Sequence, residues 1–254
     1  MNATSCATYE SVFTTRYYET DAFGNATPAA MLTMLEDTAA DHCEAIGYGL
    51  FELSRDNIGW LLLAGTMEID RYPRYGERIF VRTWLSGYTA MRGFRENLIL
   101  DGDRNPIGRA NSLWVLYDIE RRRPVKIPQD IRDRWGSAAA KSCERNLESP
   151  IPEPPRDSAE RRFLVNGFDT DANRHANNIR YLQWALDALD PELIKGKVMR
   201  SIGGRFTDEA RLGDAIVSRA GAANERDAFA HCVMARGDAG ERQCASAITR
   251  WAAV

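Results

Sequence analysis

A polar segment in the second half of the chain contains the residue types of acid–base catalysis. It reads Asp-Thr-Asp-Ala-Asn-Arg-His-Ala-Asn-Asn over residues 169–178. If the chain is extended there, Asp171, Asn173 and His175 project to one side and could converge on one substrate atom. Near neutral pH an imidazole can take a proton from water, while carboxylate and amide groups orient the ring. The spacing therefore favours attack of water on an acyl group such as a thioester carbonyl.

The same segment is expected to lead into a helix that begins near Asn177. The unpaired backbone N–H groups and the positive dipole end of such a helix could face a developing oxyanion. This makes Asn177 and Asn178 candidate oxyanion donors. A simpler interpretation stays open at this point, because Asp and Asn residues commonly form turns and cap helices.

The elements that would position this segment are predicted twice along the chain. In the first half, Thr27-Pro28 predicts the start of a helix that runs to about Ile46. Four strands are expected after this helix, over residues 60–69, 78–85, 93–100 and 107–117. In the second half, a short strand near Phe163 precedes a helix with Ile179, Leu182, Leu186 and Leu189 on one face, followed by strands over residues 197–206, 215–220, 228–235 and 243–251.

Residue identities repeat together with these elements. Adding 150 to the first-half numbers places Thr20-Asp21-Ala22 on Thr170-Asp171-Ala172. Adding 137 places Gly76-Glu77 on Gly213-Asp214. Because the same features recur in the same order, we interpret the chain as the duplication of one unit.

The two copies differ where the polar trio stands. The first half carries Asp21, Phe23 and Asn25 at those positions, so the trio is dismantled in one copy. Helix capping alone would not predict this asymmetry, which favours a catalytic role in the second half. His42 and His231 have no comparable polar neighbours in the sequence, and we expect both to be structural.

The repeat predicts an α+β fold of two tandem hotdog domains. A long helix has one apolar face to bury, and a curved antiparallel sheet wrapped around the helix buries it. Two such sheets could pair edge to edge as an internal pseudo-dimer, which would remove exposed strand edges. We expect an N-terminal hotdog domain over residues 1–128, a linker over 129–161 that includes the proline-rich stretch 151–155, and a C-terminal hotdog domain over 162–254.

Composition excludes several classes of protein. The formal net charge of −3 provides no overall field that would gather nucleic acid. The longest apolar run, residues 58–65, is far shorter than the ~18 residues of a membrane span, and residues 1–15 do not resemble a signal peptide. The five cysteines are scattered without a C-x-x-C pair, so neither disulfides nor a metal site are expected. A cytoplasmic location follows as the default expectation.

Other catalytic motifs are missing from the sequence. It has no G-x-S-x-G elbow, no H-E-x-x-H pair, no P-loop and no dinucleotide fingerprint. A cysteine nucleophile is conceivable, but no cysteine stands beside the polar segment. We therefore expect chemistry without a metal or a dissociable cofactor.

The chain resembles the acyl-acyl carrier protein (ACP) thioesterases, which are the plant fatty-acyl enzymes and their bacterial relatives. The motifs that carry the resemblance are residues 171–181, Glu19-Thr20-Asp21-Ala22-Phe23-Gly24, residues 71–77, residues 109–116 and Arg123-Pro124-Val125. They span nearly the whole chain. The resemblance implies a tandem hotdog fold and hydrolysis of fatty acyl groups from the phosphopantetheine arm of ACP. The sequence shows no plastid transit segment, which fits a bacterial relative.

The resemblance also implies a fourth catalytic residue. The glutamate of the family falls on Glu209, just before the Gly-Asp entry to a strand in the second half. It is a candidate to orient water or to hold His175. Plant members carry a cysteine directly after this glutamate, whereas this chain carries Ala210. A covalent cysteine route is thus excluded at that position, and direct attack by activated water is favoured.

The resemblance further implies that the first half shapes the acyl pocket. The candidate lining residues are Met31, Met34, Trp60, Leu62 and Met67, although ordinary core packing is the commoner role for any single one of them. Because ACP is acidic, its docking patch could consist of Arg121, Arg122, Arg123 and Lys126, or of Arg71, Arg74 and Arg78. A solvated charged turn is the alternative interpretation of the triple arginine.

These observations lead to one hypothesis with two alternatives. The hypothesis is a fatty acyl-ACP hydrolase in which His175 and Glu209 activate water and Asp171 and Asn173 position them. The first alternative is an acyl-CoA thioesterase, which would differ only in what the basic surface accepts. The second is a non-catalytic acyl-binding regulator, which would need the cavity but not the polar residues. A homodimer is compatible with each of the three.

Overall fold

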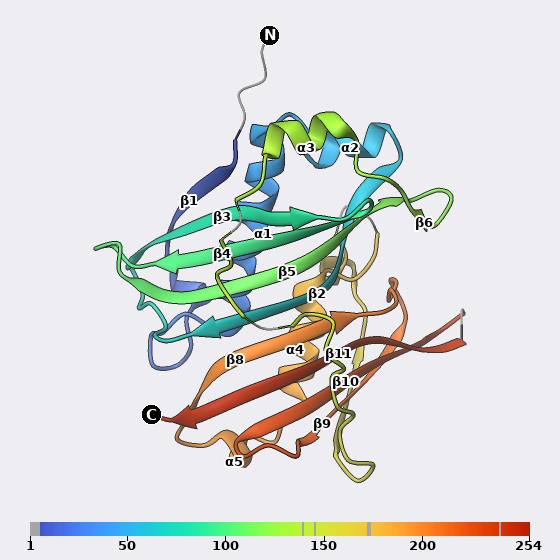
Figure 1. The fold of residues 1–254 in the computed structure, drawn as a ribbon. Helices are drawn as coiled ribbons and strands as arrows, with labels where there is room; N and C mark the ends of the chain where they lie inside the picture. The colour runs from blue at the N-terminus through green and yellow to red at the C-terminus, as the bar shows by residue number, and fades with distance from the viewer. Residues whose placement is uncertain (1–5, 139, 145, 172–173, 239) are drawn as a thin grey trace. The chain divides into compact units, whose positions relative to one another are not determined.

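The computed structural model describes residues 6–138, 140–144, 146–171, 174–238 and 240–254. The chain separates into two compact units, Met1–Leu147 (unit 1) and Glu148–Val254 (unit 2). Each unit combines one principal helix with an antiparallel sheet, as Figure 1 shows by element label.

Unit 1 is built from an antiparallel sheet and the long helix α1. Its strands are β1 (Thr8–Thr14), β2 (Ile58–Ile69), β3 (Arg78–Tyr88), β4 (Arg92–Leu100), β5 (Pro106–Asp118) and β6 (Arg123–Pro124). Its helices are η1 (Tyr17–Glu19), α1 (Pro28–Ala45), α2 (Leu50–Arg55) and α3 (Gln129–Trp135). The strand order is β1-β3-β4-β5-β2, with β6 paired to β5. Helix α1 packs against β1 and β3.

The sequence determines both ends of α1. Thr27 caps the helix, since its hydroxyl accepts a hydrogen bond from the Ala30 N–H at 3.2 Å, and Pro28 occupies the first turn, where no N–H partner is needed. Beyond the C-terminal end, Gly47 adopts φ 77°, a conformation that glycine reaches without steric cost. The buried side of the helix includes Met31 and Met34, which together remove two large apolar side chains from water.

Unit 2 repeats this plan with a shorter principal helix. Its strands are β7 (Ala159–Leu164), β8 (Lys197–Phe206), β9 (Ala215–Ala222), β10 (Ala228–Gly237) and β11 (Gly240–Ala253). Its helices are η2 (Gly167–Asp169), α4 (Asn178–Asp187) and α5 (Pro191–Ile194). The strand order is β8-β11-β10-β9-β7, and α4 packs against β7, β9, β10 and β11. Both units are therefore hotdog domains, which confirms the predicted α+β tandem hotdog fold.

The backbone hydrogen bonds of the two units match at the offsets found in the sequence. The bonds in unit 1 are Thr15 N–H to Glu77 O, Gly76 N–H to Thr15 O and Ala26 N–H to Pro73 O. The corresponding bonds in unit 2 are Val165 N–H to Asp214 O, Gly213 N–H to Val165 O and Ala176 N–H to Ala210 O. Each first-half number becomes its second-half counterpart by adding 150 before the helix or 137 after it. The repeat is thus structural as well as sequential.

The expected segments occur in the expected order, with differences at their ends. Strand β1 was not predicted, and most of the predicted strands extend by one to three residues at one or both ends of the predicted ranges. The stretch 129–161, expected as a linker, contains helix α3, whose Ile131 and Trp135 are buried in unit 1. No helix within the described residues is long and apolar enough to cross a membrane. The division of functional roles between the two halves stays a prediction.

Each unit also buries one neutral histidine where its principal helix meets its sheet. In unit 2, His231 of β10 donates from Nδ1 to the Ala185 carbonyl at 2.9 Å, and its Nε2 lies 2.9 Å from the Thr249 hydroxyl. Burial lowers the pKa of His231 to about 4. In unit 1, burial and the nearby Arg95 lower the pKa of His42 to about 4. Both rings are therefore neutral at physiological pH.

We predict that these two histidines make the fold sensitive to acid. Because their folded-state pKa lies below the ordinary value of 6.5, the stabilisation is complete above pH 6.5 and is lost as the pH falls towards 4. The free energy of unfolding should fall by about 3 kcal/mol for each histidine over this interval. Urea unfolding at pH 7.5, 5.5 and 4.5 measures the fall. The His231→Asn variant, which keeps a donor for the Ala185 carbonyl, should show a shallower fall; an unchanged slope would contradict the assignment.

Candidate active site

The polar segment after η2 forms a closed turn and not the extended strand that the spacing suggested. The Asp171 N–H donates to the His175 carbonyl at 2.9 Å, and the Arg174 N–H donates to the Asp171 carbonyl at 3.0 Å. Arg174 adopts φ 63°, a left-handed conformation that costs a non-glycine residue roughly 1 kcal/mol. Asp171 and His175 therefore stand at the two ends of one turn. Asn173, the third member of the predicted trio, lies outside the described residues.

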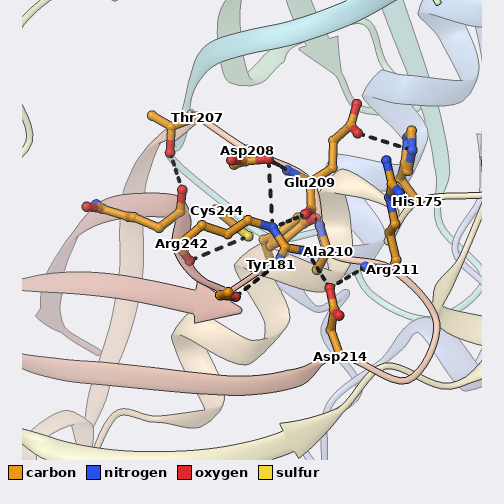
Figure 2. Close-up of polar contacts among 12 residues, drawn as sticks. His175, Tyr181, Thr207, Asp208, Glu209, Ala210, Arg211, Asp214, Arg242 and Cys244 are labelled. Carbon is orange, nitrogen blue, oxygen red and sulfur yellow. Dashed lines mark hydrogen bonds and ion pairs between the residues drawn. The ribbon is translucent and has the colours of Figure 1, made fainter. Parts of the chain in front are cut away.

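His175 meets Glu209 across two loops of unit 2. The imidazole Nε2 lies 3.1 Å from Glu209 Oε2, and the two side chains are 22% and 27% exposed. Figure 2 shows the two side chains pointing toward one another. A neutral imidazole that donates from Nε2 to the carboxylate keeps Nδ1 as its basic nitrogen, and a protonated ring forms an ion pair instead. The structure thus brings together His175 and Glu209, which are 34 positions apart in the sequence.

The backbone around Glu209 is held from two directions. The Arg242 Nε donates to the Glu209 carbonyl at 2.9 Å, and the N–H of Ala210 donates to the hydroxyl of Tyr181 at 2.6 Å. Tyr181 belongs to α4 and is buried, and burial raises the pKa of its phenol well above the ordinary value, so the hydroxyl stays neutral. Figure 2 shows these contacts around the Glu209 loop. The carboxylate is therefore presented on a rigid peptide.

Three further contacts extend this support. The Ala176 N–H donates to the Ala210 carbonyl at 2.8 Å, which ties the histidine turn to the glutamate loop. Arg242 donates from Nη2 to the Asp214 carboxylate at 2.5 Å, and the same carboxylate oxygen accepts the Arg211 N–H at 2.9 Å. The arginine that holds Glu209 is thus itself fixed at the entry to β9. Such ordering fixes the backbone on both sides of the His175–Glu209 contact, and fixed geometry of this kind is what catalysis requires.

The start of α4 confirms the capping interpretation for Asn177. Its side-chain Oδ1 accepts the Ile179 N–H at 2.8 Å, and its own N–H donates to the Asp169 carbonyl at 2.9 Å. The Asp169 carboxylate also forms an ion pair with Arg180 at 2.9 Å. An oxyanion role for Asn177 and Asn178 stays a prediction. For Asn177, its N–H would have to break the hydrogen bond to the Asp169 carbonyl before it could donate to substrate.

The equivalent positions of unit 1 lack the pair. Asn25 stands where unit 2 has His175, and Tyr72 stands where unit 2 has Glu209. The turn itself is kept, since the Asp21 N–H donates to the Asn25 carbonyl at 2.8 Å and Gly24 adopts φ 79° at the position of Arg174. The scaffold is common to both copies, whereas the histidine and the carboxylate belong to one.

The predicted acyl-pocket residues all lie in unit 1. Met31 and Met34 belong to α1, and Trp60, Leu62 and Met67 belong to β2. The three methionines are almost completely buried, while Trp60 and Leu62 are half-buried. Their assignment to an acyl pocket stays a prediction.

The predicted docking residues occupy the turn between β5 and β6 and the segment that follows it. Arg121, Arg122, Arg123 and Lys126 are all exposed. Arg121 forms an ion pair with Asp118 at 3.6 Å. In the alternative patch, Arg71 is neutralised by Glu77 and Asp101, while Arg74 and Arg78 are exposed. Docking of ACP at either patch stays a prediction.

Sequence reasoning missed the residues that support the pair. Tyr181 was quoted only as part of a motif, and Asp214 only as part of the repeat. No sequence motif pointed to Arg242, because it lies on β11 and contacts Glu209 only when the sheet has formed. Within the described part of the chain, no group of three His, Cys, Asp or Glu side chains is placed to hold a metal ion.

Two hotdog units in one chain define a tandem hotdog protein, and the histidine–glutamate contact occurs in the second unit. The family model for the acyl-ACP thioesterase N-terminal domain matches residues 7–135, and the model for the C-terminal domain of that family matches residues 152–253. The chain therefore belongs to the acyl-ACP thioesterase family, which confirms the resemblance found in its motifs.

Individual relatives agree with this membership. A palmitoyl-acyl carrier protein thioesterase of Cuphea hookeriana is 29% identical over 210 residues, which cover 75% of this chain and 49% of the relative. An oleoyl-acyl carrier protein thioesterase of Arabidopsis thaliana is 23% identical over 226 residues, with coverage of 83% and 62%. The chain thus spans about half the length of the curated relatives that it matches.

Solved structures show the same fold over nearly all of the chain. An acyl-ACP thioesterase from Bacteroides thetaiotaomicron superposes with a TM-score of 0.85 at 23% identity, covering 97% of this chain and 98% of the other. The 12:0-ACP thioesterase from Umbellularia californica gives a TM-score of 0.85 at 19% identity, covering 98% of each chain. These similarities establish the fold.

We predict that Tyr181→Phe loosens the Glu209 loop. The substitution leaves the buried Ala210 N–H without its acceptor, which should cost about 1–3 kcal/mol in the free energy of unfolding. Urea unfolding measures the loss. Tyr18→Phe is the matched control, because the Tyr18 side chain is exposed and its hydroxyl supports no buried group. Equal stability of the Tyr181 variant and the wild type would show that the hydroxyl does not support the loop.

Proposed function

We propose that the chain hydrolyses fatty acyl-ACP thioesters to a free fatty acid and ACP. The observation that carries the proposal is the His175–Glu209 contact at 3.1 Å, which occurs in the second unit of a chain of the acyl-ACP thioesterase family. The relatives that support the substrate class are named as palmitoyl-, oleoyl- and dodecanoyl-ACP hydrolases. The proposed substrate is accordingly a fatty acyl group on the phosphopantetheine thiol of ACP.

In the proposed reaction the His175–Glu209 pair activates one water molecule. The water oxygen adds to the thioester carbonyl carbon while its proton passes to the pair. The tetrahedral intermediate then collapses, the carbon–sulfur bond breaks, and the thiolate leaving group takes a proton back from the pair. Asp171 and Asn173 are assigned to positioning, and backbone N–H groups near Asn177 to the oxyanion. No covalent cysteine is used beside Glu209, since Ala210 occupies that position and is buried.

The two halves are assigned different tasks in this proposal. Residues 1–128 shape the acyl pocket through Met31 and Met34 of α1 and through Trp60, Leu62 and Met67 of β2. Residues 162–254 supply the catalytic groups. The exposed cluster Arg121, Arg122, Arg123 and Lys126 supplies positive charge for the acidic carrier protein. We place the reaction in fatty acid synthesis in the cytoplasm, without a metal or a dissociable cofactor, and with the protein acting as a monomer or a homodimer.

We predict that His175→Ala abolishes most of the hydrolysis. Loss of a general acid–base group should lower kcat/KM by about 10²–10⁴-fold. The assay follows release of free thiol from acyl-ACP and from acyl-CoA at several chain lengths. Asn25→Ala, at the equivalent position of unit 1, is the matched control and should retain wild-type activity. Equal thiol release by the His175 variant and the wild type would refute hydrolysis, and faster turnover of acyl-CoA than of acyl-ACP would reassign the substrate.

A second prediction separates the two carboxylates near His175. Glu209→Gln keeps the shape of the side chain but removes its charge, so it should lower kcat by about 10²-fold or more with little change in KM. Asp171→Asn should have a smaller effect, because Asp171 is assigned to positioning and its backbone contacts remain. Steady-state kinetics on acyl-ACP measures both values. A Glu209 variant that retains full kcat would remove Glu209 from the mechanism.

A further inference from the structure

Unit 1 contains a buried arginine whose partners are all neutral. The side chain of Arg95 on β4 is 4% exposed. Its Nη1 donates to Thr83 Oγ1 and to His42 Nδ1, both at 3.1 Å, and its guanidinium lies 5.6 Å from the centre of the Trp135 ring. No carboxylate of the described residues forms an ion pair with it. A cation in this position is costly unless an anion accompanies it.

The histidine beside Arg95 cannot provide the missing negative charge. His42 Nε2 lies 2.7 Å from the Cys6 carbonyl, so Nε2 carries the proton and Nδ1 accepts from Arg95. Tyr9 stacks on the histidine ring with 5.7 Å between centroids. The ring is therefore a neutral, fixed part of the wall that orients the guanidinium.

Two buried indole N–H groups also lack an acceptor in the described part of the chain, one on the Trp135 ring beside Arg95 and one on the Trp60 ring that packs against Trp135. The Nε1 atoms of Trp60 and Trp135 are buried, and no acceptor among the described residues contacts either of them. The two rings pack with 5.4 Å between centroids. The cluster thus combines one positive charge with two unused donors, and none of the described residues provides an ion-pair partner for the charge or an acceptor for the donors.

We propose that Arg95, Trp60 and Trp135 form a site for the carboxylate of an aliphatic acid within unit 1. A carboxylate supplies both the negative charge that Arg95 lacks and acceptor oxygens for the indole donors. The aliphatic part follows from the surroundings, since Trp135 belongs to an apolar cluster with Leu85, Leu116 and Ile131. The site belongs to unit 1, whereas the His175–Glu209 pair belongs to unit 2, and binding at it requires no hydrolysis.

Titration calorimetry of the full chain with decanoate and with decanol tests the proposal. The two probes have the same chain length and differ in the carboxylate. Decanoate should bind the wild type more tightly than decanol does. The Arg95→Gln variant should lose about tenfold to a hundredfold in decanoate affinity, as expected for the loss of charge-assisted hydrogen bonds, and should bind decanol as the wild type does.

The controls separate this site from non-specific binding. Arg82→Gln removes an equal charge from an exposed arginine of β3 and should leave decanoate affinity unchanged. Trp135→Phe keeps the ring, removes one donor and should weaken decanoate binding severalfold, which decides the question if Arg95→Gln does not fold. Equal affinity of the wild type for decanoate and decanol would overturn the proposal. So would undiminished decanoate binding by a folded Arg95 or Trp135 variant.

Discussion

The backbone hydrogen bond from Ala176 to Ala210 is the contact on which the candidate site depends. It joins the turn that carries His175 to the loop that carries Glu209, and unit 1 contains the same bond between Ala26 and Pro73. Because the bond uses only main-chain atoms, it persists whatever side chains stand nearby. Duplication therefore delivered two equivalent frames in which side chains could change without loss of the loop geometry.

The two copies have placed their polar groups in different parts of this frame. Unit 2 presents a partly exposed histidine and glutamate on its loops, and Tyr181 and Arg242 hold the backbone around Glu209. Unit 1 keeps the turn without the pair and buries Arg95 in its interior instead. Arg95 reduces the stability of unit 1, because burial removes its guanidinium from water and its hydrogen-bond partners are neutral.

The scaffold around Glu209 holds the peptide of this residue from three elements of unit 2. Its carbonyl accepts from Arg242, which pairs with Asp214 at the entry to β9, and the next N–H is bonded to Tyr181 of α4. A strand, a strand entry and a helix thus converge on one peptide. Contacts with helices and strands hold a side chain more accurately than a free loop does, because they restrict the movement of the peptide that carries it.

Much of this protein could be read from the order of its residues. The offsets of 150 and 137 located the repeat, helical spacing located α1 and α4, and the family motifs pointed to His175 and Glu209, because these signals are local or depend on residue identity. The closed turn at Arg174 and the partners of Arg242 and Arg95 were decided only by the tertiary structure. These contacts join residues far apart in the chain or depend on a left-handed backbone, and neither property follows from the pattern of apolar and polar residues.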